Sequence, residues 1–400
     1  MTNDKTCQVL HVLDKFYPPD PRVDGEAHAL SKAGYNINLL VITKDKTKDY
    51  YHKAPFSIVK ITHISNLTYR FSALAYTIPV YHIITFFKIL SATRQYKPQI
   101  LHVHDMVVAR SCFWVSKLLG IKVILDLHEN RPIIMNEYKL MEKPLSKLLI
   151  CLKWWARAEK KMIQRSNKTI VVTQEAKDWY LEHYGISKSK ITVVSNTISD
   201  QFKSQKINCL TPPATTSLIY IGDTGYRRGL SETIKALEIT KGRGLEVELI
   251  IVGSSSYDTV LHDYVRENSL ENMVHFVGWV PEIDLHKWLA KSQIGISPLH
   301  RNVHHDTTMA NKISQYTLYS LPIIVSDCSA QAKLIQTYEC GCVHEAANPR
   351  SIADCIQNVI ELLKSSEKMK SRSEALFQEQ FNSTYVYKNL LCLYFEEICQ

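Results

Sequence analysis

Short apolar segments alternate with helical patterns along this chain of 400 residues, and the alternation starts again near the middle. Short apolar strands separated by helices are typical of parallel sheets that are covered on both faces. The expected strands of the first half are Val9–Leu13, Ile37–Ile42, Ile58–Ile61, Ile100–His104, Val123–Leu127, Thr169–Val172 and Ile191–Ser195. Those of the second half are Leu218–Ile221, Glu246–Val252, Val274–Val277, Ile294–Ile296 and Ile323–Val325. The sequence therefore predicts an α/β protein with two doubly wound domains that face each other across a cleft.

A polar stretch over residues 197–216, which contains Pro212 and Pro213, separates the two halves. A chain of this length is too long for one ordinary core and suggests two domains of about 200 residues each. We expect an N-terminal domain over residues 1–198 and a C-terminal domain over residues 199–380. A C-terminal helix over residues 381–400 is expected to pack back on the first domain.

The net charge of +9 is unevenly distributed along the chain. Residues 1–200 hold 29 Lys and Arg against 17 Asp and Glu, whereas residues 201–400 hold 19 against 22. A basic first half suits an anionic partner such as a membrane surface or a phosphorylated lipid. No segment resembles a nucleic-acid-binding module, so we expect no nucleic-acid partner.

The cysteines and the apolar stretches indicate the compartment. The ten cysteines follow no disulfide framework, and several lie in apolar surroundings as free thiols do: Cys7, Cys112, Cys151 and Cys392. Residues 1–5 lack the apolar segment of a signal peptide. The apolar stretch Phe71–Leu90 is interrupted by proline, histidine and lysine, so a buried or interfacial helix is expected there. We therefore expect a cytoplasmic protein.

A strand, a glycine-bearing turn and a helix follow one another in Leu218–Gly229 and beyond. The turn carries Arg227 and Arg228. A helix N-terminus offers free N–H groups and a partial positive charge, and arginine is a forked, always charged donor. The segment therefore predicts a phosphate or pyrophosphate site, with a solvated turn as the alternative.

Polar side chains follow two neighbouring strands of the first half. Asp105 comes directly after one strand, and His128 and Glu129 follow the next. Ligands of such sheets bind beyond the carboxyl ends of the strands, so these side chains are candidates for an active site. A neutral imidazole at His128 could exchange a hydrogen bond with a sugar hydroxyl or a phosphate, although a histidine that only caps a helix is the alternative.

The first loop of the chain holds Arg22, Asp24 and Gly25. Glycine at a helix start lets a ligand approach the backbone closely. Arg22 could bind a phosphate or pair with Asp24. The loop is a weaker candidate for ligand binding than the Arg228 turn, because proline-rich loops before helices are common.

A third candidate segment spans residues 300–315 and leads into a helix. Thr307, Thr308 and Asn311 could supply an N-cap and backbone donors for phosphate, and Lys312 adds charge. Gln315 lies about one turn further on and could reach a ribose hydroxyl. The neighbouring His304 and His305 are not expected to bind a metal, since adjacent histidines rarely hold one ion well.

At these residues the chain resembles the GT-B nucleotide-sugar glycosyltransferases, in particular retaining glycosyltransferase family 4, over almost its whole length. Asp20-Pro21-Arg22-Val23 with Gly25-Glu26-Ala27 is similar to the first loop of one bacterial branch, and His104-Asp105 and Asp126-Leu127-His128-Glu129 are similar to its "HD" and "DxHE" signatures. Gly222 with Arg228-Gly229 is similar to the phosphate turn, and the segments 311–316 and 321–325 to the "NKxxEY…GxPVV" region. Together these motifs are specific for the fold and superfamily, and poor guides to the sugar.

The resemblance implies a GT-B fold with two Rossmann-like domains and assigns roles to individual residues. The catalytic residues would be His128, Asp105 and Glu129, and the acceptor-side residues Arg22 and Asp24. The donor-binding residues would be Gly25, Gly222, Arg227, Arg228, Gly229, Thr307, Thr308, Asn311, Lys312 and Gln315. Arg228 would bind the donor diphosphate, His128 the transferred sugar and Gln315 the ribose, while Gly278-Trp279-Val280 would frame the base.

Four residues depart from the family pattern at the donor site. Asp223 stands where the family often has arginine, and Gln315 replaces the ribose glutamate. Thr307 takes the place of the first acidic residue of the motif, and Ser320 that of a helix glycine. Donor affinity and activity therefore follow less directly from the resemblance than the fold does.

The implied reaction is retaining transfer of a sugar from a nucleotide-diphosphate sugar, with a UDP-sugar expected first, to a glycan or lipid-linked acceptor in surface polysaccharide or glycoconjugate synthesis. No metal and no further cofactor are expected, because arginine, lysine and backbone donors would stabilise the leaving diphosphate. One alternative is an isomerase of the UDP-sugar 2-epimerase type. Another, favoured by Asp223 and Gln315, is a binding subunit without turnover.

A basic amphipathic stretch covers residues 139–168, where leucines, Trp155 and Met162 recur at helical spacing beside lysines and arginines such as Lys143, Lys147, Lys153, Arg157, Lys160, Lys161 and Arg165. Basic amphipathic helices bind anionic bilayer surfaces. The stretch could therefore place the protein at the inner face of the membrane and bring a lipid-linked acceptor to it. An ordinary helix that packs its apolar side on the sheet is the alternative.

Overall fold

The computed structural model describes residues 7–15, 17, 20–44, 56–136, 144, 149–208, 215–365 and 367–399. These residues form two compact units. Unit 1 comprises the chain up to Ser195 together with the segment from Tyr387 onwards, and unit 2 comprises Asn196–Val386. The segment from Tyr387 is the larger part of the last helix, α18 (Ser383–Cys399). The end of the chain therefore belongs to the unit that its beginning forms.

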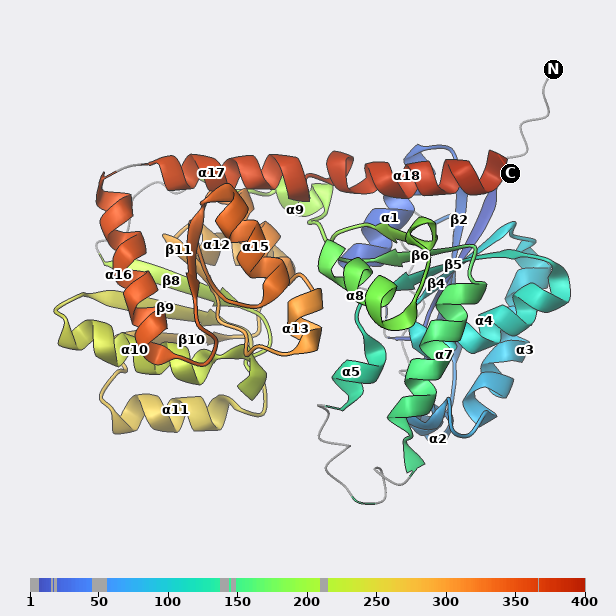
Figure 1. The fold of residues 1–400 in the computed structure, drawn as a ribbon, viewed down its shortest axis with the longest axis horizontal. Helices are drawn as coiled ribbons and strands as arrows, with labels where there is room; N and C mark the ends of the chain where they lie inside the picture. Colours follow the sequence, from blue (N-terminus) through green and yellow to red (C-terminus); the bar gives the residue numbers. More distant parts are fainter. Residues whose placement is uncertain are drawn as a thin grey trace. The chain divides into compact units, whose positions relative to one another are not determined.

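Unit 1 is built on a parallel sheet with the strand order β3-β2-β1-β4-β5-β6-β7 (Figure 1). Its described strands are β1 (Gln8–Leu13), β2 (Asn36–Thr43), β3 (Ile58–His63), β4 (Ile100–His104), β5 (Lys122–Leu127), β6 (Lys168–Val171) and β7 (Ile191–Val193). Its described helices are α1 (Pro21–Lys32), α2 (Asn66–Arg70), α3 (Val80–Tyr96), α4 (Met106–Leu119), α5 (Arg131–Met135), α7 (Leu152–Arg165), α8 (Gln174–Tyr184) and most of α18. The order reverses between β1 and β4, and doubly wound sheets bind ligands beyond the carboxyl ends at such a switch point.

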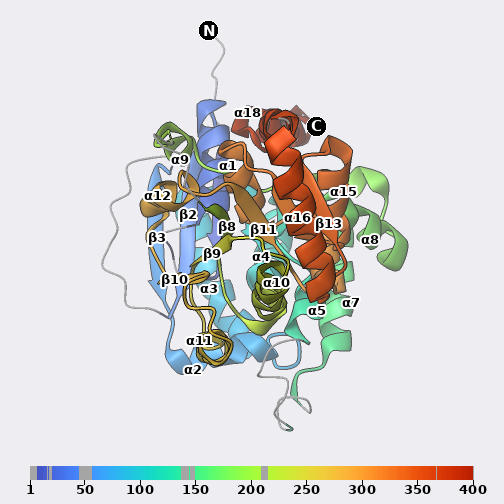
Figure 2. The ribbon, with the colours of Figure 1, turned by 90° about the vertical axis from the view of Figure 1, so that its left-hand side faces the viewer.

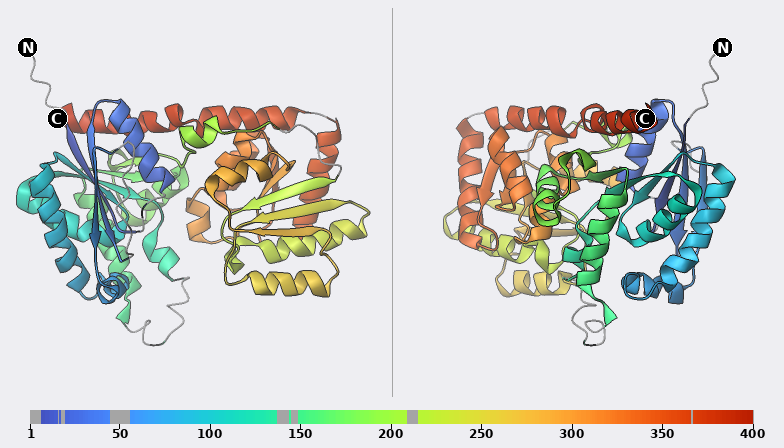
Figure 3. Two further views of the ribbon diagram at one scale, coloured as in Figure 1. Left: turned by 180° about the vertical axis from the view of Figure 1, so that it is seen from behind. Right: turned by 45° about the vertical axis from the view of Figure 1, so that its right-hand side comes forward.

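The two faces of this sheet carry different side chains because residues alternate along each strand. On one face Val12 and Val103 join an apolar core with residues of α3, α4 and α7. On the other face the imidazoles of His11, His102 and His104 are buried and stacked, with ring centroids 4.4 and 4.6 Å apart. Helices α1 and α18 lie side by side near this second face (Figures 1 and 3). The polar face of the sheet is therefore a covered, dry environment.

Unit 2 repeats the arrangement with the order β10-β9-β8-β11-β12-β13 (Figure 2). Its described strands are β8 (Thr216–Ile221), β9 (Val247–Val252), β10 (Val274–Gly278), β11 (Ile294–Ser297), β12 (Ile323–Ser326) and β13 (Gly341–His344). Its described helices are α9 (Asp200–Ser204), α10 (Leu230–Gly242), α11 (Asp258–Glu267), α12 (Leu285–Leu289), α13 (Val303–Thr307), α14 (Asn311–Leu318), α15 (Ser329–Tyr338), α16 (Pro349–Ser365) and α17 (Lys368–Leu376). The chain thus holds two Rossmann-like sheets, and the switch point of the second lies between β8 and β11.

Every strand expected from the sequence is present, with ends that differ by one or two residues. The sequence analysis missed α13, α15 and β13, and also α9, which lies in the stretch expected to be a linker; these elements are short or rich in small polar residues and so lack an apolar period. The Phe71–Leu90 stretch is a short 3-10 turn followed by α3, which starts at Val80. None of the described helices is both long and apolar enough to cross a membrane.

Helix α1 begins earlier than the sequence indicated. The helix was expected from about Gly25, but its N-cap is Asp20, whose carboxylate accepts hydrogen bonds from the N–H groups of Arg22 and Val23. Pro21 occupies the first helical position, where its fixed φ and missing N–H are tolerated. Gly25 therefore lies within the helix instead of at its start.

The cysteines are only partly as expected. Cys342 of β13 and Cys355 of α16 form a disulfide, which the absence of a framework spacing did not indicate. The four cysteines expected as thiols from their apolar surroundings are free. A pair 13 residues apart becomes adjacent here because α16 packs directly against β13.

The close approach of two turns in unit 2 generates a stability prediction. Gly253 has φ +141°, and a Cβ there would stand 1.9 Å from the carbonyl oxygen of Gly222. Gly253→Ala should destabilise unit 2 by roughly 3 kcal/mol, because the strain of an alanine at positive φ and the clash with the Gly222 carbonyl both raise the energy of the folded state. Gly244→Ala is the matched control: its φ is +74°, no atom lies within 4 Å, and the cost should be about 1 kcal/mol. Urea denaturation measures both, and equal costs would contradict the packing argument.

Candidate functional site

Two loops meet at the switch point of unit 2, one after β8 and one after β11. Gly229 approaches Pro298 so closely that a Cβ on Gly229 would stand 1.8 Å from the Pro298 carbonyl oxygen. The N–H of His300 donates to the carbonyl oxygen of Arg227 at 3.0 Å. These contacts hold the turn Tyr226–Arg228 against the segment that precedes α13.

Arg228 lies beside a carboxylate at this edge. Its Nε is 3.4 Å from Oδ1 of Asp223, and the same oxygen accepts the N–H of Gly225 at 3.0 Å. The Asp223 side chain is 55% exposed and the Arg228 side chain 29%, so both groups are open to a ligand. Asp223 therefore competes with any anion for the guanidinium of Arg228.

Lys312 supplies a second cation from the first turn of α14. Its Nζ lies 3.5 Å from the centroid of the Tyr220 ring, and a Cβ on Gly222 would be 3.6 Å from it. Burial, together with the nearby Arg228, lowers the pKa of Lys312 well below its usual range. A bound anion would offset both effects and favour the charged ammonium.

The helices that start at this edge have open N-termini. Helix α14 begins after Ala310 and α10 begins after Gly229, and neither residue provides a side-chain hydrogen bond to the first N–H groups. Free N–H groups and the helix dipole favour negative charge there. Together with Arg227, Arg228 and Lys312 they make this edge of unit 2 suited to a diphosphate.

The threonines expected to cap α14 form hydrogen bonds with α13 instead. The hydroxyl of Thr307 donates to the carbonyl oxygens of Val303 and His304, and that of Thr308 donates to His304 O, so both bond back to α13. The cap of α14 is Ala310, and Asn311 is the exposed first residue of the helix. Gln315 lies on α14 with 8% of its surface exposed.

His304 and His305 are neutral at the same edge. Burial lowers the pKa of His304 to about 3 and that of His305 to about 4, with Arg227 and Arg228 acting in the same direction. The Nδ1 atom of His305 hydrogen-bonds the carbonyl oxygen of His300 at 2.6 Å. His304 Nδ1 and His305 Nε2 are buried without a hydrogen-bond partner among the described residues. The two imidazoles therefore add polar atoms to the cationic edge without adding charge.

In unit 1 the carboxyl ends of β4 and β5 bring Asp105, Asp126 and His128 together. Nε2 of His128 lies 2.8 Å from Oδ2 of Asp126, and Nδ1 lies 3.7 Å from Oδ2 of Asp105. The backbone N–H of His128 donates to Asp105 Oδ1 at 3.2 Å. Burial alone would lower the pKa of His128, but the two carboxylates outweigh it and raise the pKa to about 9. His128 is therefore an imidazolium near neutral pH, not the neutral ring expected from the sequence.

Asp105 adopts a strained backbone at this point. Its φ is +64° and its ψ 170°, a region that costs about 1–3 kcal/mol for a residue with a side chain. Its N–H donates to the carbonyl oxygen of Asp126 at 2.8 Å. The strain turns the carboxylate toward His128 instead of onto the first turn of α4, which Asp105 does not cap.

Arg22, expected on the acceptor side, is turned inward. Its Nε and Nη2 atoms donate to Asp126 at 3.0 and 2.7 Å, and Nη1 donates to the carbonyl oxygen of Val194 at 2.9 Å. Only 9% of the side chain is exposed. Asp24 nearby accepts a short hydrogen bond from the Tyr17 hydroxyl. Arg22 therefore supports the site from within, because its donors are already engaged.

Gly25 and Glu129 also have neighbours inside unit 1. A Cβ on Gly25 would stand 1.9 Å from the hydroxyl of Tyr387 on α18, so this contact by itself requires a glycine at position 25. Oε1 of Glu129 accepts a hydrogen bond from Arg131 at 2.6 Å. Glu129 is partly exposed at the edge that carries His128.

The sequence reading did not single out Asp126 or Glu26. Both are fully buried. The sequence signal that could have identified them is an ionisable residue inside an apolar strand or on the buried side of a helix. With His102 and His104 they place four possible ligand atoms within 4.8 Å of one another. The Arg22 guanidinium contacts both carboxylates, so a positive charge already stands between them.

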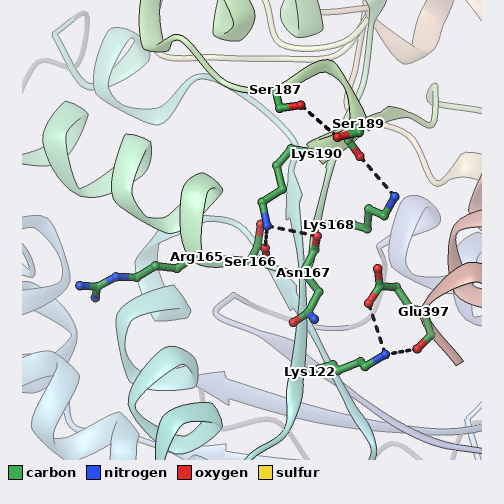
Figure 4. A pocket seen from close by; sticks show the side chains of 9 residues that line it. All are labelled: Lys122, Arg165, Ser166, Asn167, Lys168, Ser187, Ser189, Lys190 and Glu397. Atoms are coloured by element: carbon green, nitrogen blue, oxygen red, sulfur yellow. Dashed lines mark hydrogen bonds and ion pairs between the residues drawn. The ribbon is translucent and has the colours of Figure 1, made fainter. Parts of the chain in front are cut away.

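A cavity of about 510 Å³ lies at the opposite, amino edge of the unit 1 sheet (Figure 4). It is lined by the cations Lys122, Arg165, Lys168 and Lys190. The three lysines contact carbonyl oxygens or glutamates of α18, while Arg165 extends away from them (Figure 4). Residues that line this cavity thus hold the end of α18, at the edge of the sheet opposite to the one that carries His128.

Family comparisons agree with the fold. The family described as Glycosyltransferase Family 4 matches residues 23–202, and Glycosyl transferases group 1 matches residues 215–362. The chain therefore belongs to the GT-B glycosyltransferases of the group 1 type.

Curated relatives are distant. Glycogen synthase of Mycobacterium tuberculosis (strain CDC 1551 / Oshkosh) is 22% identical over 53% of this chain, and the match spans about half of that enzyme, 49%. Alpha-D-kanosaminyltransferase of Streptomyces kanamyceticus is 17% identical over 71% of the chain and 73% of that protein.

Solved structures show the same fold at low identity. Sucrose-phosphate synthase from Thermosynechococcus elongatus has a TM-score of 0.76 and 14% identity, with 98% of this chain and 99% of that chain covered. Anabaena HepE, solved in complex with UDP, has a TM-score of 0.69 and 13% identity, with 96% and 98% covered. The whole chain therefore has the GT-B fold.

The charge state of His128 generates a pH prediction. Its pKa is raised to about 9, so between pH 6.5 and 9 the folded protein holds a proton that the unfolded chain has lost. The free energy of unfolding should fall as pH rises through this window, by up to about 1.4 kcal/mol per pH unit from this group. Burial raises the pKa of Glu26 and Glu159 to about 8, which acts in the same direction up to that pH.

Urea denaturation at pH 6.5, 7.5 and 9 measures this dependence. His128→Asn should flatten the slope, because asparagine does not titrate. Identical slopes for the wild type and the variant would show that His128 is not protonated in the folded protein.

Proposed function

We propose that this protein is a retaining glycosyltransferase that moves a sugar from a nucleotide-diphosphate sugar to a glycan or lipid-linked acceptor, without a metal ion. The cationic edge of unit 2 carries the proposal: Arg227, Arg228, Lys312 and two open helix N-termini surround one small region. A diphosphate is the ligand whose two negative groups would use all of these donors. The structure of HepE in complex with UDP supports UDP as the first nucleotide to test.

The reaction needs a leaving group that accepts negative charge. As the bond between the sugar C1 and the phosphate oxygen breaks, preorganised arginine, lysine and backbone donors stabilise the diphosphate. The acceptor hydroxyl forms the new bond to C1 on the same face, and its proton passes to the departing phosphate oxygen. This route leaves the anomeric configuration unchanged, and the donors of unit 2 provide the charge that a metal would otherwise supply.

His128 contributes a donor in this reaction and not a base. As an imidazolium between Asp105 and Asp126 it has no free lone pair, so it cannot take the proton of the acceptor. Its Nδ1–H is 3.7 Å from Asp105 and can turn to an oxygen of the transferred sugar. The proposal requires unit 1 to present this group to the sugar that unit 2 holds by its diphosphate.

Nucleotide binding tests the donor site first. Arg228→Gln should weaken UDP binding about 10- to 100-fold, because charge-assisted hydrogen bonds contribute about 1.5–3 kcal/mol. Asp223→Asn should strengthen it, since the competing carboxylate is removed. Isothermal titration measures both, and Arg243→Gln, which removes an exposed arginine paired with Asp354, is the control expected to match the wild type.

Turnover separates the enzyme from its alternatives. With a bound nucleotide identified, incubation with the corresponding nucleotide sugar and acceptor should release the nucleoside diphosphate, and NMR should show a product of the donor's anomeric configuration, with EDTA without effect. Epimerisation of the donor without acceptor would indicate an isomerase instead. Binding without any turnover would indicate the binding subunit, and failure to bind UDP, GDP or ADP would refute the donor site itself.

We also propose that unit 1 contacts an anionic membrane through α7. Of the 139–168 stretch, residues 139–143 and 145–148 lie outside the described part of the chain. On α7 the apolar side, with Trp155 and Met162, is buried in the core, so an ordinary packed helix accounts for that side. The opposite side exposes four cations at intervals of four residues, Lys153, Arg157, Lys161 and Arg165, next to the half-exposed Trp154. A basic stripe with an interfacial tryptophan suits the headgroups of anionic lipids.

Vesicle sedimentation tests this contact. Replacement of the four α7 cations by glutamine should abolish binding to vesicles with 30% phosphatidylserine, since each contributes about 1 kcal/mol near such a surface. Replacement of four exposed lysines of unit 2 by glutamine, Lys287, Lys291, Lys368 and Lys370, removes the same charge and should leave binding unchanged. A wild-type protein that does not sediment with these vesicles would end the membrane proposal.

A further inference from the structure

Asp126 is the shared acceptor of the unit 1 site. Its Oδ2 accepts from Nε of Arg22 at 3.0 Å, from His104 Nδ1 at 3.1 Å and from His128 Nε2 at 2.8 Å. Its Oδ1 accepts from Nη2 of Arg22 at 2.7 Å. Burial disfavours the carboxylate, but Arg22 and then His128 hold the pKa of Asp126 well below its usual range. An ionised, fully buried Asp126 therefore fixes the position of every group that donates to it.

A chain of polar contacts continues from Arg22 to the last helix. Nη2 of Arg22 is 3.0 Å from Oε1 of Glu26, and Oε2 of Glu26 is 3.4 Å from Nε2 of His102. Nδ1 of His102 is 2.7 Å from the hydroxyl of Tyr394 on α18. Glu26, His102 and Tyr394 have no exposed surface, so water does not substitute for these contacts.

The hydroxyl of Tyr394 is placed to select the tautomer of His102. A phenol that donates to Nδ1 leaves the ring proton on Nε2, which faces Glu26. Glu26 in turn contacts the same Nη2 of Arg22 that bonds Asp126. Without the hydroxyl, Nδ1 of His102 loses this hydrogen-bond partner.

The end of α18 is held in place independently of this chain. Lys122 contacts the backbone carbonyl of Glu397 and lies 3.6 Å from its carboxylate (Figure 4). Lys168 pairs with Glu396 at 3.1 Å. The Tyr394 ring also packs against Tyr35, with centroids 5.4 Å apart. The backbone of α18 should therefore stay in place when only the hydroxyl of Tyr394 is removed.

We propose that Asp126 and Tyr394 are positioning residues for His128: Asp126 orients the imidazole directly, and Tyr394 does so from the last helix through His102, Glu26 and Arg22. This inference rests on the proposed function in one respect only, namely that the function supplies the ligand that His128 contacts. The groups that face His128 are Asp105 from the end of β4, Asp126 and His104 from the strands, and Arg22, Glu26 and Asp20 from α1 and its cap.

Four single variants test the proposal. Asp126→Asn keeps the shape and removes the charge, and Glu159→Gln is its matched control, a buried acid-to-amide change whose partners are Tyr180 and Tyr184. Tyr394→Phe removes the buried hydroxyl. Tyr385→Phe is its control, the same change on the same helix at a tyrosine that is 55% exposed. UDP binding and thermal melting verify that each variant is folded.

The readouts are the NMR titration of the His128 ring, assigned by its loss in His128→Asn, and release of nucleoside diphosphate from the donor. In Asp126→Asn the titration should move from about 9 toward the ordinary 6.5, and turnover should fall about 100-fold with unchanged nucleotide affinity. In Tyr394→Phe the His128 ring signals should shift and turnover should fall about 10-fold, again with unchanged nucleotide affinity. Both controls should match the wild type.

The outcomes decide the proposal whether or not the protein turns over a sugar. A His128 that still titrates near 9 in Asp126→Asn, or ring signals in Tyr394→Phe that match those in Tyr385→Phe, would overturn it. A wild type that binds no nucleotide refutes the proposed function alone, because the His128 titration in the four variants still reports on positioning.

Discussion

The buried pair of Arg22 and Asp126 is the interaction on which unit 1 depends. Two charges removed from water are costly unless they are paired and fully hydrogen-bonded, and here each has several partners. Removal of either residue would leave the other charge buried and uncompensated. The pair joins α1 to the carboxyl end of β5, so the residues that neighbour it, including the strained Asp105, have one arrangement available to them. Geometry at His128 is thus a consequence of electrostatics several residues away.

The carboxyl edge of the unit 2 sheet has the opposite arrangement, an excess of positive charge instead of a balanced pair. Arg228 and Lys312 lie close together with Asp223 as the nearby carboxylate, and the neighbouring histidines remain neutral because burial and these cations oppose their protonation. An excess of positive charge that Asp223 compensates only in part is unfavourable in the empty protein and becomes favourable when an anion arrives. The same type of sheet therefore carries a neutralised, rigid edge in one unit and a charged, receptive edge in the other.

The fold and the location of both edges could be predicted from the sequence, and the detailed roles could not. Apolar strands and the carboxyl-end rule placed Asp105 with His128 and Arg228 with Gly229, because these follow from local pattern and parallel pairing. The inward turn of Arg22 depends on Asp126, a partner far away in the chain, and the need for glycine at position 25 depends on Tyr387 of the last helix. Such contacts have no local pattern. The order of residues also suggested that Thr307 caps α14. Its hydroxyl instead donates to a carbonyl oxygen of the additional short helix α13.

The assignment of residues from Tyr387 onwards to unit 1 has a consequence for synthesis on the ribosome. Proteins are made from the N-terminus, and domains usually fold as they emerge. Here the first sheet emerges early, but the helix that covers Gly25 and reaches His102 is translated after unit 2. Until then the row of imidazoles on that face lacks its cover. The nascent polypeptide consequently completes its first half only after unit 2 has been made, which ties maturation of one half to successful production of the other.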